Sequence, residues 1–177
     1  SKWIQDFKED TKVLMLTLNQ VKPDLQQYTM NHSLEYQECL ESIDLSSKNV
    51  LELGVGEGAL SQLIWEQSPK SWTGYEIDDQ YQLVPTENQQ LIIGDFTKVN
   101  FSHLCEHWCL ISNPPYNTLK FIEENILTRI YDAIIMIPQS KRDKYVLMGF
   151  ELVTTIDGTD FVPSSEGKHL VMKRGFK

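Results

Sequence analysis

Residues 51–60 read LELGVGEGAL, in which an apolar run leads into three glycines at every second position. The apolar run, residues 49–54, predicts a strand, and residues 59–67 predict the helix that follows it. Glycines between a strand and a helix let the backbone approach a ligand closely, and the free N–H groups at the start of the helix face that ligand. We therefore expect a nucleotide-like ligand at this turn, bound by Gly54, Gly56 and Gly58.

Six further short apolar runs follow this first strand along the chain. They predict strands at residues 71–78, 90–96, 108–113, 131–138, 150–156 and 168–175. Helices or crossovers between most of these strands indicate an α/β fold with a mostly parallel sheet covered on both faces. No helix is predicted between the last two strands, so we expect them to form a C-terminal antiparallel hairpin around DGTDFVPSSEG.

Acidic residues stand where the first three predicted strands end. Glu52 lies in the end of the first strand, and Glu76 ends the second, 22 residues after Gly54, where a carboxylate can accept both ribose hydroxyls. Asp95 ends the third strand and can accept from an adenine amino group. Positions at the carboxyl ends of consecutive strands meet over the topological switch point of an open sheet. They predict an adenosine-containing cofactor, with Ile77 beside Glu76 and with Phe96 against the adenine ring.

The chain shows no internal repeat, low-complexity tract or long linker, so we expect a single domain over residues 1–177. Helical spacing over residues 2–21 and 33–42 predicts an N-terminal helical lead, residues 1–47, before a core of residues 48–177. Because the chain begins at Ser1 without a methionine, we also expect that residues precede it in the natural protein.

Composition limits the partners and the compartment. No apolar run approaches the roughly 20 residues that span a bilayer, so a membrane role is not expected. Three cysteines without a framework spacing favour a reducing compartment, and we expect a cytoplasmic protein. A net charge of −9 argues against broad nonspecific capture of nucleic acid. Two clusters of basic residues could form a local positive face or could be ordinary solvated surface. They are Lys141, Arg142 and Lys144, and Lys168, Lys173, Arg174 and Lys177.

The segment HLCEHWC, residues 103–109, alternates histidine and cysteine but does not predict a metal site. Zinc-binding cysteine pairs are normally separated by two to four residues, and Cys109 belongs to a strand that His103 and Cys105 only precede. Buried thiols and surface imidazoles explain the pattern, so no metal is expected.

The fourth predicted strand runs into LISNPPYN, residues 110–117, where two prolines fix a stiff turn. With this NPPY string, the chain resembles class I S-adenosylmethionine-dependent methyltransferases that act on planar amide or amino nitrogen. Over residues 28–175 it is similar to the ribosomal RNA adenine N6-dimethyltransferase family, which includes the erythromycin-resistance methylases. The motifs VLELGVGEGALSQLI, YEID, GDF, NPPYN, MIPQSK and FVP occur in that family's order.

This resemblance implies a Rossmann-like methyltransferase fold and S-adenosylmethionine as the cofactor. The Asn113 side chain and the Pro114 carbonyl would accept hydrogen bonds from the target amino group, with Asn113 also beside the cofactor. Pro115 would help to fix this loop, and Tyr116 would stack on the flipped base. Two further residues have structural alternatives. Phe161 matches a second wall for the base and a packing residue at the hairpin tip equally well, whereas for Tyr28 packing of a helix is favoured over closing across the cofactor.

Two features depart from that family. It usually has leucine or isoleucine where this chain has Pro114, and it carries a helical RNA-binding domain that has no counterpart within residues 1–177. The NPPY spelling also resembles DNA adenine methyltransferases and release-factor glutamine methyltransferases. We therefore expect methylation of adenine N6 in RNA or DNA, with target specificity supplied by loops, by residues 1–47 or by a partner subunit. The alternatives are protein glutamine N5-methylation and a noncatalytic cofactor-binding subunit of a larger complex.

Overall fold

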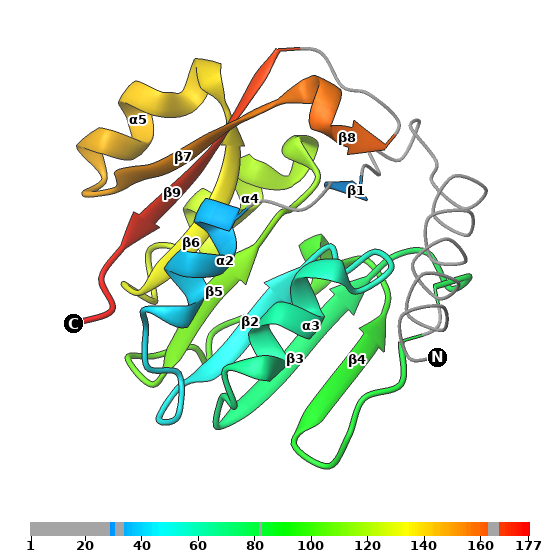
Figure 1. Cartoon of the computed structure of the whole chain (residues 1–177). Coiled ribbons are helices and arrows are strands. Elements are labelled where there is room, and N and C mark those ends of the chain that lie inside the picture. Colours follow the sequence, from blue (N-terminus) through cyan, green and yellow to red (C-terminus); the bar gives the residue numbers. More distant parts are fainter. Residues whose placement is uncertain (1–28, 31–33, 82, 163–166) are drawn as a thin grey trace.

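A seven-stranded sheet occupies the centre of the protein (Figure 1). The computed structural model describes residues 29–30, 34–81, 83–162 and 167–177. The strand order in this sheet is β4-β3-β2-β5-β6-β9-β7. The strands are β2 (Asn49–Leu53), β3 (Ser71–Glu76), β4 (Gln89–Ile93), β5 (Trp108–Ser112), β6 (Ala133–Pro138), β7 (Glu151–Asp157) and β9 (Lys168–Arg174). All seven strands predicted from the sequence are confirmed.

The direction of the strands also agrees with the prediction. β2 pairs in parallel with β3 and β5, β3 with β4, and β5 with β6, whereas β9 is antiparallel to both β6 and β7. The chain runs from β2 outward to β4 and then returns to β5 on the other side of β2. The switch point of the sheet therefore lies between β2 and β5, and the loops after these strands meet at the edge of the sheet toward which the arrows of β2 and β5 point in Figure 1.

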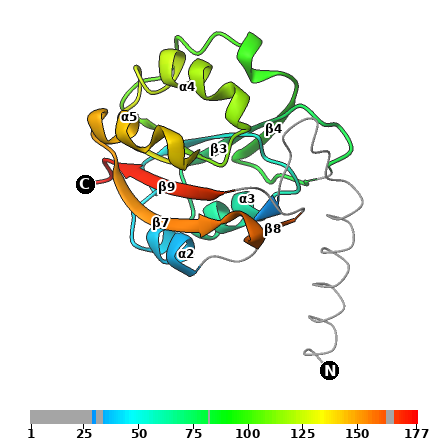
Figure 2. The ribbon, with the colours of Figure 1, turned by 90° about the horizontal axis from the view of Figure 1, so that it is seen from above.

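Helices cover both faces of this sheet, as Figure 2 shows from above. One face carries α2 (Leu34–Glu41) and α3 (Ala59–Glu66), and the other carries α4 (Leu119–Asn125) and α5 (Arg142–Leu147). α2 and α3 lie within the helices predicted at residues 33–42 and 59–67. The helix predicted over residues 2–21 lies outside the described residues. None of the helices in the described part of the chain is long and apolar enough to cross a bilayer.

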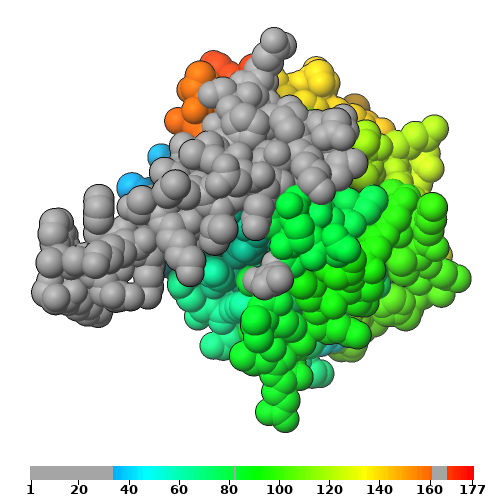
Figure 3. All heavy atoms as spheres, turned by 90° about the vertical axis from the view of Figure 1, so that its right-hand side faces the viewer, coloured from blue at the N-terminus to red at the C-terminus, as the bar shows by residue number. Residues whose placement is uncertain are grey.

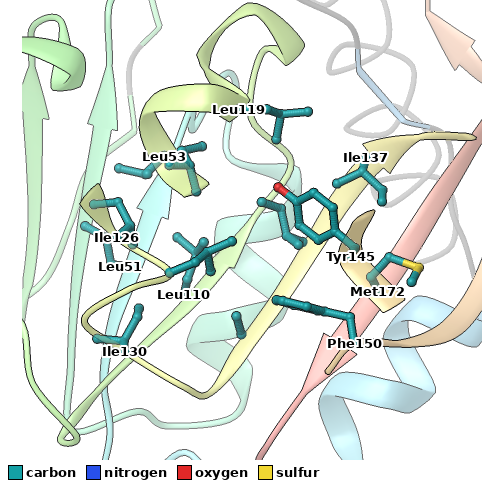
Figure 4. Packing of buried hydrophobic residues seen from close by; sticks show 14 of the residues in the cluster. Leu51, Leu53, Leu110, Leu119, Ile126, Ile130, Ile137, Tyr145, Phe150 and Met172 are labelled. Atoms are coloured by element: carbon teal, nitrogen blue, oxygen red, sulfur yellow. The ribbon is translucent and has the colours of Figure 1, made fainter. Parts of the chain in front are cut away.

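Alternation along the strands divides the core between the two faces. Leu51 and Leu110 pack toward α4 and α5, whereas their neighbours Val50 and Ile111 pack toward α2 and α3. Both clusters are formed by side chains that are almost fully withdrawn from solvent. Figure 4 shows the first cluster, in which Leu119 of α4 and Tyr145 of α5 lie over the strands. The two-sided burial explains why the central strands read as near-continuous apolar runs rather than as alternating ones.

Several short elements connect these strands. The 3-10 turns are η2 (Phe96–Lys98), η3 (Tyr116–Thr118), η4 (Gln139–Lys141) and η5 (Gly158–Asp160). A separate two-stranded sheet pairs β1 (Thr29–Met30) with β8 (Phe161–Val162) in antiparallel fashion. This pairing, which the sequence did not predict, joins the segment before α2 to the connection between β7 and β9 (Figure 1).

Candidate active site

The glycine loop after β2 lies directly against the NPPY loop after β5. Gly54, Gly56 and Gly58 all have positive φ, at 79°, 59° and 92°, which side-chain-bearing residues rarely adopt. At Gly54 there is no room for a side chain either, because a Cβ would lie 2.9 Å from the Cδ of Pro115. At Gly56 a Cβ would meet nothing within 4 Å. The glycine loop therefore packs against the NPPY loop at Gly54, whereas the space beside Gly56 is free for a ligand.

Ser112, at the end of β5, links the strand that precedes the NPPY loop to the strand that precedes the glycine loop. The main-chain pairing of β2 with β5 ends at Leu51 and Leu110, so the strands diverge beyond this point. The Ser112 hydroxyl then replaces the ladder, since it donates to the Leu53 carbonyl at 2.6 Å and accepts from the Leu53 N–H at 3.2 Å. This side chain spans the switch point and fixes the distance between the ends of the two strands.

Glu76 joins the glycine loop to the end of β3. One carboxylate oxygen accepts from the Gly56 N–H at 2.7 Å, and the other accepts from the Asp78 N–H at 2.9 Å. Burial raises the pKa of Glu76, while these N–H donors oppose the shift. Each carboxylate oxygen carries a second lone pair, so the group can still accept from ligand hydroxyls beside the open position at Gly56.

Glu52 does not lie at this edge, and its predicted place among the cofactor-binding residues is corrected. It is 1% exposed. Its Oε2 accepts from the Ser61 hydroxyl of α3 at 2.6 Å and from the Trp72 indole N–H of β3 at 2.9 Å. Burial raises its pKa to about 8. The side chain points into the core because it alternates with Leu51 and Leu53 along β2, and it ties α3 and β3 to that strand.

Of the three residues predicted around adenine, Ile77 is exposed, Asp95 caps a turn and Phe96 is buried. Ile77, directly after Glu76, is 53% exposed and presents an apolar surface. Asp95 accepts from the Thr97 N–H at 3.0 Å and from the Thr97 hydroxyl at 2.6 Å, which lowers its pKa and caps η2. Phe96 is only 6% exposed and packs edge-on to Phe121 in the core. This burial leaves little of Phe96 exposed for contact with an adenine ring, and its place against that ring stays a prediction. Figure 3 views the molecule from the side on which the β4 edge lies.

The Asn113 amide is held by a residue that the sequence did not single out. The hydroxyl of Tyr36 in α2 donates to Asn113 Oδ1 at 2.9 Å. Tyr36 is fully buried, and burial raises its pKa well above the usual value, so it stays protonated and able to donate. Pro114 is buried as well, and the Pro115 carbonyl accepts from the N–H and hydroxyl of Thr118. The whole loop is thus fixed by contacts on both sides.

Tyr116 completes the NPPY string and has its own partner. Its hydroxyl is hydrogen-bonded to Nδ1 of His169 in β9, and the two rings lie 5.5 Å apart with an interplanar angle of 31°. Burial raises the pKa of Tyr116 and lowers that of His169, although the charge of Asp157 opposes the second shift. The sequence did not single out Tyr36, Ser112 or His169, because the contact of each depends on the folded arrangement. Ser112, directly before NPPY, is the one with a signal in the sequence, since it is a polar residue at the end of an apolar strand.

The predicted roles of Tyr28 and Phe161 stay predictions. Tyr28 lies outside the described residues. Phe161 is described only by its backbone, which pairs with Met30 between β8 and β1. The described residues contain no group of three or more His, Cys, Asp or Glu that could hold a metal ion.

The two basic clusters do not form a free positive face as a whole. Lys141 and Lys144 both pair with the buried carboxylate of Glu123. Arg174 is 7% exposed, and its guanidinium donates to the carbonyls of Leu127, Ile130, Tyr131 and Met148. These three cations therefore support packing between elements, which favours the structural interpretation for them.

Comparisons with known proteins agree with the motifs. A family model described as "Ribosomal RNA adenine dimethylase" matches residues 5–153. The chain is 34% identical over 114 residues to "Ribosomal RNA small subunit methyltransferase A" of Metamycoplasma arthritidis, covering 59% of this chain and 43% of that protein. It is 32% identical over 119 residues to the protein of the same name from Mesomycoplasma hyopneumoniae, covering 63% and 41%. The chain thus spans less than half the length of these two relatives.

Solved structures share the fold. The 23S rRNA methyltransferase ErmE superposes with a TM-score of 0.67 at 18% identity, over 84% of this chain and 70% of that one. A dimethyladenosine transferase from Plasmodium falciparum superposes with a TM-score of 0.66 at 17% identity, over 84% and 63%. Both confirm the Rossmann-like arrangement expected from the sequence.

Proposed function

The chain belongs to the ribosomal RNA adenine dimethylase family, and from this premise we propose that it transfers a methyl group from S-adenosylmethionine to the N6 amino group of adenine in RNA. One observation carries the proposal. The glycine loop and the NPPY loop are in direct contact at Gly54 and Pro115. A cofactor on the first loop therefore meets a planar nitrogen held by the second.

The residues at the edge of the sheet fit this cofactor. The main chain at Gly54, Gly56 and Gly58 offers close approach, with open space at Gly56. Glu76, already beside the Gly56 N–H, would accept from the ribose hydroxyls. Ile77 would cover the adenine ring, and the Asp95 carboxylate would accept from the adenine amino group. When bound, S-adenosylmethionine supplies a methyl group on a positively charged sulfur.

The NPPY loop would position the nucleophile. The lone pair of an exocyclic adenine nitrogen is delocalised into the ring, so the nitrogen attacks poorly by itself. Asn113 Oδ1 and the Pro114 carbonyl would accept its two N–H groups, which localises the lone pair and directs it toward the methyl carbon. As the new N–C bond forms, the S–C bond breaks and the nitrogen releases one proton to solvent. Positioning and electrostatics dominate such a step, and no strong general base is needed.

Tyr116 would cover the flipped base. Base–aromatic stacking contributes about 1–3 kcal/mol per base in single-strand binders. Phe161 and Tyr28 remain candidates for a second wall and for a cover over the cofactor. Pro115 contributes by packing on Gly54, which sets the distance between the two loops.

RNA is favoured over DNA because the family and the named relatives act on ribosomal RNA by name. Since three of the basic residues support packing, we include in the proposal that a partner subunit contributes to choosing the target.

We also propose a single domain over residues 1–177 and a cytoplasmic location. All three cysteines, Cys39, Cys105 and Cys109, are free, which suits a reducing compartment.

Incubation with S-adenosylmethionine labelled in the methyl group, together with total RNA, DNA or cell protein, tests this function. We expect label in RNA. Label only in DNA would overturn the choice of RNA, and label only in protein would favour the glutamine alternative. An absence of label in all three pools would contradict methyl transfer and favour a noncatalytic cofactor-binding subunit.

A further inference from the structure

The hydroxyl of Tyr116 reaches across the sheet edge to a strand that runs opposite to β5. His169 lies in β9, opposite Pro138 of β6, and its Nδ1 is hydrogen-bonded to the Tyr116 hydroxyl. The two residues are 53 positions apart in the chain. Their contact connects the NPPY loop to the antiparallel end of the sheet.

The two partners of this hydrogen bond are both uncharged. His169 is 7% exposed, and burial lowers its pKa, so the imidazole is neutral at neutral pH. A neutral imidazole has one acceptor nitrogen and one donor nitrogen. Burial raises the pKa of Tyr116, so its phenol keeps its proton. Both side chains are therefore neutral, and the hydrogen bond between them needs no ionised partner: the phenol donates to a bare Nδ1, or Nδ1–H donates to the phenol oxygen, according to the imidazole tautomer.

This bond fixes the far end of the tyrosine ring. The near end is fixed because η3 is closed by the Thr118 N–H, which donates to the Pro115 carbonyl at 2.9 Å. A tyrosine held only at its backbone can rotate about both side-chain bonds. The hydrogen bond at the hydroxyl fixes the direction of the ring axis, and the imidazole, with its centroid 5.5 Å away and its plane tilted by 31°, limits rotation of the ring about that axis. Stacking on a base requires a defined ring plane.

We propose that His169 is a positioning residue, which holds the ring of Tyr116 in the plane where it covers the target base. This role rests on the proposed function of Tyr116. His169 acts through Tyr116 and touches neither the cofactor nor the reacting nitrogen. Its removal should therefore lower methyl transfer without changing the affinity for S-adenosylmethionine.

A double-mutant cycle measures whether the two residues act as one unit. His169→Leu removes the imidazole, Tyr116→Phe removes the hydroxyl but keeps the ring, and the double variant removes both hydrogen-bonding groups. We expect each single variant to lower kcat/KM for RNA about tenfold, and the double variant to be no worse than the more impaired single variant. His169→Asn places an amide oxygen near the position of Nδ1 and should recover most of the loss. Affinity for S-adenosylmethionine should stay within about twofold in all four proteins.

A matched control replaces a histidine that faces solvent. The His107 side chain is 70% exposed and precedes β5 at the opposite edge of the sheet. His107→Leu should leave kcat/KM unchanged. Multiplicative losses in the double variant would overturn the positioning role, as would an Asn variant no better than Leu or a parallel loss of cofactor affinity.

A second measurement separates this role from the function on which it rests. In protein with 13C-labelled tyrosine rings, the Tyr116 ring should flip slowly in the wild type, faster in His169→Leu and slowly again in His169→Asn. If wild-type protein methylates no RNA, the proposed function fails, whatever the ring does. If it methylates RNA but the ring flips equally fast in wild type and His169→Leu, the positioning role alone is overturned.

Discussion

The hydroxyl of Tyr36 donates a hydrogen bond to Oδ1 of Asn113 over 2.9 Å, although the two residues are 77 positions apart. Tyr36 lies in α2, which the sequence assigned to a helical lead before the core. The bond uses one lone pair of Oδ1 and leaves the other for a substrate amino group. A helix outside the strand and loop pattern that carries the motifs thus sets the orientation of the amide on which the proposed chemistry depends.

Replacing Tyr36 with phenylalanine should slow methyl transfer. The variant keeps the buried ring but frees the Asn113 amide to rotate. A single hydrogen bond contributes about 1 kcal/mol, so we expect kcat to fall about fivefold with the cofactor affinity unchanged. Steady-state kinetics and calorimetric titration with S-adenosylmethionine provide the two values. Tyr131→Phe, at a tyrosine that is 61% exposed, is the matched control and should behave as wild type. An unchanged kcat in Tyr36→Phe would show that the amide needs no such support.

Glu76→Ala should act mainly on cofactor binding. The change removes the acceptor beside the Gly56 N–H and the acceptor proposed for the ribose hydroxyls. We expect the Kd for S-adenosylmethionine to rise at least tenfold, as measured by calorimetric titration. Asp79→Ala removes a nearby exposed carboxylate and should leave the Kd within about twofold. Equal affinities in Glu76→Ala and wild type would refute the ribose assignment.

Gly54→Ala should impair both stability and activity. Its φ of 79° strains a side-chain-bearing residue, and the added Cβ would lie 2.9 Å from Pro115 Cδ. The strain alone costs about 1–3 kcal/mol, and the clash would also separate the two loops. Gly56→Ala carries similar strain at a φ of 59° without any such contact. Urea unfolding should therefore show a larger loss of stability for Gly54→Ala, and equal losses in the two variants would contradict the close contact of the loops.

Glu52 should make stability depend on pH. Burial raises its pKa from 4.5 to about 8. The folded state then holds this proton more tightly than the unfolded chain, so its contribution is fully present below about pH 4.5 and is lost as pH rises toward 8. Glu52→Gln removes the titration. Between pH 5 and 8 the free energy of unfolding of the wild type should fall relative to the variant, by at most about 1.4 kcal/mol per pH unit. Parallel pH profiles from urea unfolding would contradict a protonated Glu52.

The strands and their order along the chain could be predicted because each strand is a short apolar run bounded by polar segments. The site loops could be predicted because glycines and prolines restrict the backbone locally, whatever the rest of the fold. The direction in which a side chain points at the end of a strand was harder to predict from the sequence. Glu52 and Phe96 stand in motif positions next to the site, yet alternation and packing turn both into the core.

Contacts between distant elements could not be predicted at all. Tyr36 and His169 reach the NPPY loop from α2 and β9, and nothing in their local sequence indicates a partner. The sequence left open whether Lys141 and Lys144 belong to a positive face, and their ion pairs with Glu123 of α4 depend on how the helices pack. Such pairs depend on how helices and strands pack, which a single sequence does not reveal.

The position of the transferred methyl group tests the central claim most directly. RNA incubated with the protein and labelled S-adenosylmethionine can be digested to nucleosides and separated by mass spectrometry. We predict label on N6 of adenosine, with most of it lost in Asn113→Ala while the cofactor Kd stays within a few-fold. Label on another atom or base, or an Asn113→Ala variant that methylates as fast as wild type, would contradict the assignment of the NPPY loop as the holder of the target nitrogen.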